Sequence, residues 1–152
     1  MNTFRALTAV LMLMLAGCRS APAVAGASAA VGDLTVRDAV AWGLESSHST
    51  TIGFRATATT ADTLFAVESA DGMAMLHEQV NGKMVPMERL PLDAGATVVV
   101  GGGGPHIMLT GATHGYAPGD SVRLVLSWAR SGRVALRVPL VRFSDAASLL
   151  GR

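Results

Sequence analysis

Methionine and histidine side chains gather in one stretch of this chain, between residues 73 and 108. The sequence has eight methionines, three of them within the first fourteen residues. The other five lie in this stretch with His77 and His106, and they are Met73, Met75, Met84, Met87 and Met108. Methionines that only fill a core would be spread over every strand of a domain. Because thioether and imidazole are ligands that a soft metal such as Cu(I) prefers, the stretch predicts a copper site.

The segment 106–110 reads as a β-strand with one apolar and one metal-binding face. In a strand, residues two apart point to the same side of the sheet. Ile107 and Leu109 form an aliphatic pair that is expected to face the core. His106 and Met108 are therefore expected to face outward together.

The segment 73–80 shows the same alternation. Leu76 is expected to point into the core, on the face shared by Ala74 and Glu78. His77 then lies on the opposite face, together with Met73 and Met75. This second strand contributes one imidazole and two further thioethers.

The dipeptide Asn81-Gly82 is the strongest hairpin signal in the sequence. A two-residue turn pairs Gln79 with Met84, which places Met84 on the face of His77, diagonal to it and within reach of a shared ion. The same register pairs Leu76 with Met87 and directs Met87 toward the core. A bulge in the hairpin would exchange the two methionines, so Met87 remains the alternative third ligand.

These arguments select four metal ligands: His77, Met84, His106 and Met108. All four are neutral donors, which suit the monocation Cu(I) and suit Zn(II), Ca(II) or Mg(II) poorly. Met73, Met75 and Met87 are retained as auxiliary ligands.

The elements that position these residues are predicted to be short strands, since turn residues recur and helical periodicity is nearly absent. This pattern predicts an all-β sandwich or barrel, and it does not give the strand order. The expected strands are 34–42, 50–60, 63–69, 73–80, 83–88, 97–100, 106–110, 122–128 and 133–138. Residues 144–152 are expected to form a short helix or a tail.

The first seventeen residues read as an export signal, with Arg5 as the sole charge before an apolar run. The run ends in Leu15-Ala16-Gly17-Cys18, which resembles a bacterial lipobox and implies cleavage before Cys18 and lipid on its sulfur. An ordinary signal peptide cut after Ala25 or Ala30 is the alternative. The resulting division is a lipoprotein signal peptide at 1–17, a lipidated cysteine and flexible tether at 18–32, a copper-binding domain at 33–142 and a C-terminal tail at 143–152.

Charge and cysteine content exclude several functions. Removing Arg5 from the twelve basic residues leaves eleven against eleven acidic ones, a formal charge of zero. A nucleic-acid partner would need a basic face, and none is indicated. The single cysteine, Cys18, leaves the domain without a disulfide, a redox pair or the thiolate of a blue-copper site. Neither a phosphate-binding loop nor a nucleophile elbow is present, and an enzyme is not predicted.

From about Leu34 to Val138 the chain resembles the periplasmic copper chaperones of the PCuAC family. Their signature is a His, a Met, twenty-one residues and then His-x-Met, and here twenty-one residues separate Met84 from His106, followed by Met108. Leu76-His77-Glu78 and the run from Ala117 to Asp120 are also similar to the family's pattern. The interval from His77 to Met84 is six residues, where the family usually has about ten.

This resemblance implies a Greek-key, cupredoxin-like β-sandwich that carries Cu(I) on its surface. It also implies delivery of copper to a cuproprotein, either the CuA centre of cytochrome c oxidase or another copper chaperone. The expected location is the bacterial cell envelope, facing the periplasm, with the lipid on Cys18 as membrane anchor. A non-metal, immunoglobulin-like envelope lipoprotein that acts as a protein-interaction module is the competing interpretation.

Overall fold

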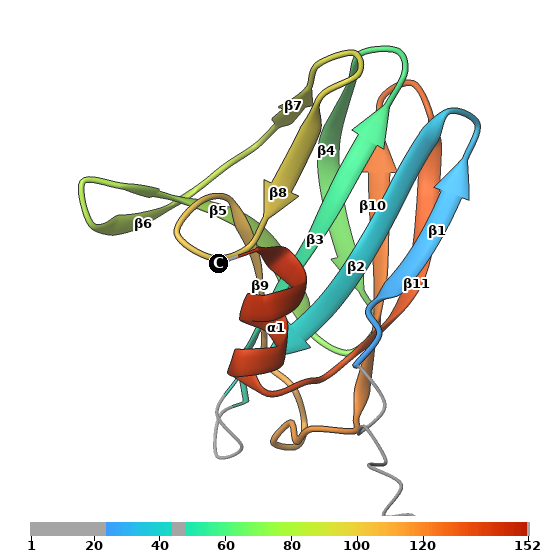
Figure 1. Ribbon diagram of the computed structural model, residues 1–152. Helices are drawn as coiled ribbons and strands as arrows, with labels where there is room; N and C mark the ends of the chain where they lie inside the picture. The colour runs from blue at the N-terminus through green and yellow to red at the C-terminus, as the bar shows by residue number, and fades with distance from the viewer. Residues whose placement is uncertain (1–23, 44–47, 152) are drawn as a thin grey trace, which may run out of the picture.

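Two β-sheets packed face to face make up the computed structural model, which describes residues 24–43 and 48–151 (Figure 1). The larger sheet has the order β1 (Ala27–Val31), β2 (Leu34–Trp42), β3 (Thr50–Ala58), β9 (His106–Thr110), β5 (Met73–Val80) and β6 (Lys83–Pro86), and β8 (Thr97–Val100) also pairs with β3. The smaller sheet has the order β11 (Gly132–Pro139), β10 (Ser121–Trp128), β4 (Asp62–Ser69) and β7 (Leu90–Leu92). The predicted all-β sandwich is confirmed. The predicted signal peptide and Cys18 lie outside the described residues.

The core lies between the two sheets and is built from the alternate residues of each strand. Phe54 and Ile107 from the larger sheet and Leu126 and Trp128 from the smaller one are almost completely buried. Burying one such side chain contributes about 1.5 to 3 kcal/mol. Since the aliphatic residues of β9 are fixed in this core, the residues between them must face outward.

Strand β1 corrects the part of the predicted flexible tether at 18–32 that falls on residues 27–31. Its residues pair with β2 across a tight turn at Gly32-Asp33, with Val31 opposite Leu34, and Gly32 has the positive φ of 60° that such a turn needs. Alanines have low strand propensity, which is why the composition indicated a tether. Their small side chains nevertheless pack against the core, as Ala29 does.

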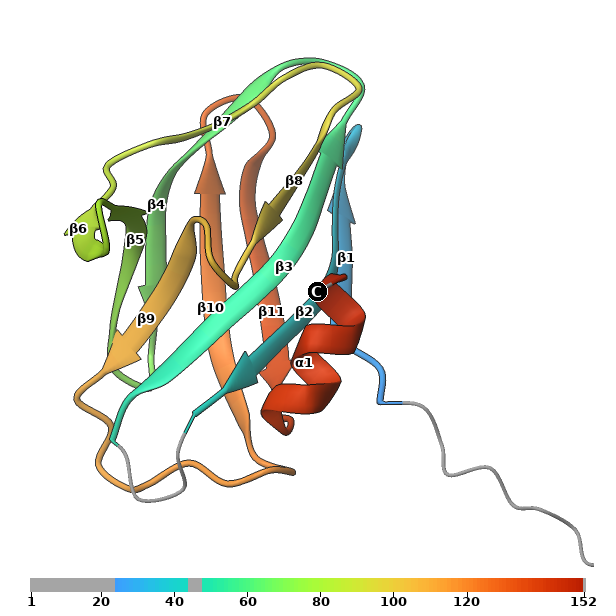
Figure 2. The same ribbon diagram turned by 60° about the vertical axis from the view of Figure 1, so that its left-hand side comes forward.

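Two further elements differ from the predicted strand pattern. β7 is a three-residue strand whose central residue, Pro91, is tolerated because it pairs on one side only, with Thr63 of β4. The predicted tail forms helix α1 (Phe143–Leu150), which lies outside the sandwich over β2 and β3 (Figure 2). Its buried residues Ala146 and Leu150 pack on Val40. No helix among the described residues is long and apolar enough to span a membrane.

The junction between β8 and β9 sets the position of the first residue of β9. Both strands pair with β3, β8 along Phe54 to Thr57 and β9 along Thr50 to Ile52. The chain between them leaves the sheet as a loop that the Gly101 N–H closes by donating to the Pro105 carbonyl. Gly53 lies at this break, where an added Cβ would come within 2.6 Å of the Val100 carbonyl oxygen.

A buried carboxylate fastens the turn between β10 and β11 to the start of β4. Asp62 is 7% exposed and accepts hydrogen bonds from the backbone N–H groups of Thr63, Arg130 and Ser131. Burial alone would raise the pKa of Asp62, but these donors outweigh it and the pKa is lowered. The carboxylate therefore stabilises the fold above its unfolded pKa, and that stabilisation is lost as pH falls through the folded value.

Replacing Asp62 with alanine is expected to lower the free energy of unfolding by about 2 kcal/mol at neutral pH, because buried N–H donors lose a charged acceptor. The loss should be constant between about pH 5 and pH 8 and smaller below about pH 4, where Asp62 of the unfolded wild-type chain becomes protonated. Urea unfolding followed by circular dichroism measures both. Asp93→Ala, at an exposed turn, is the control, and an Asp62→Ala loss that is equal at pH 7 and pH 3 would contradict this account.

Candidate metal centre

Two imidazoles lie side by side at the centre of the site. His77 of β5 and His106 of β9 are direct partners in the antiparallel ladder. Their ring centroids are 6.0 Å apart and their planes are inclined by 24°. Directly opposed residues of a sheet project to the same face, so the two rings stack over its outer surface. Each histidine is nevertheless only 8% exposed.

The nitrogen atoms of His106 have different neighbours. Nδ1 lies 3.0 Å from the carbonyl oxygen of Gly104, and a carbonyl can only accept, so Nδ1–H donates. The lone pair of the neutral ring is then on Nε2, which lies 3.2 Å from the sulfur of Met84. A lone-pair nitrogen and a thioether sulfur thus lie next to each other.

The Nδ1 atom of His77 is buried and has no hydrogen-bond partner among the described residues. Leaving a buried polar atom unpaired costs about 1 to 3 kcal/mol. A metal ion in the plane of the His77 ring would satisfy such an atom.

The hairpin has the register that the sequence predicted. Gln79 is opposite Met84, and the two-residue turn is made by Asn81 at φ 52° and Gly82 at φ 76°. This left-handed pair is the type I′ geometry of a tight hairpin. Met84 is 52% exposed and reaches back over His106.

Met87 does not join this group. It is half-buried and packs against the main core. With Phe65, Met75 and Pro86 it lines a hollow of about 260 Å³ between β4 and the β5–β6 hairpin. The structure therefore brings Met84, and not Met87, to the histidines.

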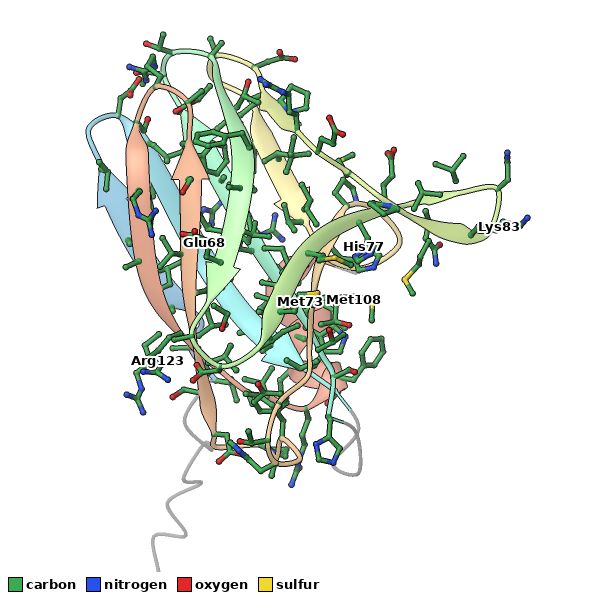
Figure 3. The ribbon with its side chains drawn as sticks, turned by 180° about the vertical axis from the view of Figure 1, so that it is seen from behind. Glu68, Met73, His77, Lys83, Met108 and Arg123 are labelled. Atoms are coloured by element: carbon green, nitrogen blue, oxygen red, sulfur yellow. The ribbon has the colours of Figure 1, made fainter. Side chains whose placement is uncertain are left out.

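Met108 lies one step further along β9, on the same face as His106. It is half-buried, with Met75 of β5 opposite it on one side and Thr51 of β3 on the other. Figure 3 shows Met73, His77 and Met108 gathered on one side of the sheet, away from Lys83 at the hairpin tip. The shared outward face expected from strand alternation is present.

The exposure of the site differs from the expectation that the histidines face water. The imidazoles are buried, and the thioethers carry the exposed surface. A hollow of about 220 Å³ opens beside Met84 and His106, and its wall includes Trp42 and Phe143. Nothing in the sequence pattern indicated that Phe143 of α1 borders the site.

The remaining histidines and the acidic side chains of the described residues do not form a further metal site. Within residues 24–43 and 48–151, no three His, Cys, Asp or Glu side chains lie close enough to hold an ion. His48 Nδ1 is 2.9 Å from the Ala112 carbonyl oxygen, and the His114 ring packs against Tyr116.

We expect the neutral ring of His106 to be the Nδ1-protonated tautomer in the metal-free protein. The Gly104 carbonyl fixes it, as outer partners of metal-binding histidines commonly do. Two-bond ¹H–¹⁵N correlation spectra distinguish the tautomers. A predominant Nε2–H form would contradict the geometry, and His48, with its own carbonyl contact through Nδ1, serves as the internal reference.

Solved structures with the same fold include three domains that have copper-related names. The chain is similar to the "Copper-bound PCuAC domain from PmoF2", with 19% identity, a TM-score of 0.63, and coverage of 76% of this chain and 97% of that one. The "apo PmoF2 PCuAC domain" is 18% identical with a TM-score of 0.63, and the match covers 76% of this chain and 94% of that one. The "Apo PCuAC domain from PmoF1" is 17% identical with a TM-score of 0.66, and the match covers 76% of this chain and 98% of that one. The fold that the PCuAC resemblance implied is confirmed.

Sequence comparison identifies the family. None of the curated proteins matches the chain. The family model described as "Putative lipoprotein LpqE-like" matches residues 23–140. This range includes β1 to β11 and ends before helix α1. This match covers most of the chain, and the protein therefore belongs to the LpqE-like family.

Proposed function

We propose that this protein is an extracytoplasmic copper chaperone that binds one Cu(I) ion through His77, Met84, His106 and Met108. The observation that carries the proposal is the 3.2 Å approach of His106 Nε2 to the Met84 sulfur, beside the unpartnered Nδ1 of His77. Because Nδ1 of His106 donates to the Gly104 carbonyl, Nε2 of the neutral ring and the Met84 sulfur both offer lone pairs to an ion. The copper-bound state of the similar PmoF2 domain supports the choice of metal.

The ligand chemistry suits a carrier of Cu(I). Two imidazoles and two thioethers bring no charge, so a monocation is held without the carboxylates or thiolates that divalent ions favour. The exposed thioether of Met84 gives an incoming ligand access to the ion, while the buried histidines keep the donors in place. Such a site exchanges its cargo by stepwise ligand replacement and performs no reaction on it, so the protein acts as a carrier and not as an enzyme.

The acceptor in this proposal is a cuproprotein of the same compartment. The resemblance to PCuAC chaperones favours the CuA centre of cytochrome c oxidase, with another copper chaperone as the second recipient. Copper would reach either one as Cu(I), handed over at the exposed Met84 side of the site.

The proposed location is the bacterial cell envelope, facing the periplasm, with lipid on Cys18 as the anchor. The lipoprotein description of the family supports this, as does the lipobox-like sequence before Cys18. A diffusing acceptor would then meet a donor held at the membrane surface.

The double variant His106→Ala/Met108→Ala is expected to lose more than about 100-fold in Cu(I) affinity, since even outer partners of metal ligands contribute 10- to 100-fold. Competition with a chromophoric Cu(I) chelator measures this. Met87→Leu is the matched control and should bind as the wild type does. Equal affinity in the double variant would refute the ligand assignment, and a wild type that takes no copper would favour the interaction module.

X-ray absorption on the Cu(I)-loaded protein should show two nitrogen and two sulfur scatterers. Met84→Leu should leave one sulfur, because Leu keeps the volume of Met and removes its donor. If Met87→Leu removes the sulfur instead, the hairpin register is not the one that holds the ion.

Replacing Cys18 with serine is expected to release the protein from the membrane fraction of its native host, since the anchor is held by the transfer of acyl methylenes into the bilayer. Fractionation and mass spectrometry of the N-terminus follow the change. Cleavage after Ala25 or Ala30 in the wild type would show that the signal peptide is of the ordinary kind.

A further inference from the structure

Two methionines on the outward face of the sheet are left over by the four-ligand site. Met73 and Met75 are 63% and 40% exposed. Their role is therefore not to fill gaps in the core, as buried methionines do. Both come from β5 and share the face of His77. Apolar side chains that are exposed next to one another, beside a metal site, require an explanation of their own.

The ladder places these thioethers next to Met108. Met75 is directly opposite Met108, so their Cβ atoms are about 4.5 to 5.5 Å apart. Met73 is opposite Thr110 and lies one strand repeat beyond Met75, about 6.8 Å along β5. Long, unbranched thioether arms can close on one ion from these positions. Figure 3 shows Met73 and Met108 projecting from neighbouring strands.

We propose that Met73, Met75 and Met108 form a second, thioether-only site for Cu(I), at which copper first binds before it moves to the histidine pair. This inference rests on the proposed copper function and adds the route by which the ion enters. Met108 belongs to both sites, because it lies between the row of His77 and His106 and the row of Met73. One ion therefore moves between the sites, and the stoichiometry stays at one.

The surroundings of the entry site select a soft monocation. The residues paired with its three methionines across the ladder, apart from the methionines themselves, are Thr51 and Thr110, which are neutral. A thioether-only site offers nothing to Ca(II), Mg(II) or Zn(II), which require oxygen, nitrogen or thiolate ligands. Soft Cu(I) accepts such ligands.

The transfer is a ligand exchange without redox chemistry. Met73 and Met75 donate sulfur lone pairs to Cu(I) while the ligands of the delivering molecule leave with their own electron pairs. Met108 keeps hold of the ion as His106, His77 and Met84 replace the other two thioethers. Copper remains Cu(I), and no proton is released because every ligand is neutral. Exposed thioethers capture the ion, and the buried imidazoles retain it.

The double variant Met73→Leu/Met75→Leu tests the entry site. Leucine keeps the exposed apolar volume and removes the sulfur donors, so the fold is preserved. Its Cu(I) affinity at equilibrium is expected to match the wild type within about twofold, since the histidine site is intact. Its rate of copper uptake from a bicinchoninate–Cu(I) complex, measured by stopped flow, is expected to fall at least tenfold. Met87→Leu is the control for methionine loss and should keep the wild-type rate.

The outcomes separate this inference from the proposed function. A wild type that takes up copper while the double variant matches its rate would overturn the entry site and leave the chaperone proposal standing. A wild type that takes no copper from the chelator overturns both. A slower rate accompanied by an equally reduced affinity would show that Met73 or Met75 belongs to the final site, and that also overturns the entry role.

A second measurement isolates the thioether site. His77→Ala/His106→Ala should still bind one Cu(I), more weakly, with only sulfur scatterers from protein in its X-ray absorption spectrum. Adding Met73→Leu/Met75→Leu to that variant should abolish the binding. Retained binding in the fourfold variant would overturn the assignment of these residues. If the histidine variant does not fold, the uptake rate of the Met73→Leu/Met75→Leu protein alone tests the entry site.

Discussion

The site depends on the register between β5 and β9. His77 and Met75 of one strand are opposed to His106 and Met108 of the other, so four soft donors lie on one outward face. A slip of a single residue would turn either set toward the core and expose aliphatic side chains to water. The buried Leu76, which is opposite Ile107, makes that slip costly. The energy that holds the core together is thus the same energy that aligns the proposed metal ligands.

Burial divides the ligands into two kinds. The imidazoles are enclosed and stacked, and the Gly104 carbonyl fixes the ring of His106 through Nδ1. The thioethers of Met84, Met75 and Met73 are exposed. An ion carrier needs both properties, because rigid donors hold the cargo and accessible donors allow another molecule to deliver or remove it.

Segments distant in the sequence complete the surroundings of the centre. The loop between β8 and β9 leaves the sheet where Gly53 allows close approach, and it returns with its Gly104 carbonyl directed at His106. Helix α1 covers β2 and β3 (Figure 2). Its first residue, Phe143, lines the hollow beside Met84. Trp42 and Phe143 thus give the proposed metal site an apolar border.

The sequence by itself determined the all-β class, the outward face of His106 and Met108, and the Asn81-Gly82 hairpin, since strand alternation and turn chemistry are local properties. Only the tertiary structure decided that β5 and β9 are neighbours, that β1 joins the sheet despite its alanines, and that the imidazoles are buried. Those outcomes follow from long-range pairing and from the layers packed over each strand. Burial in particular is a property of the whole assembly, and no local pattern around His77 or His106 encodes it.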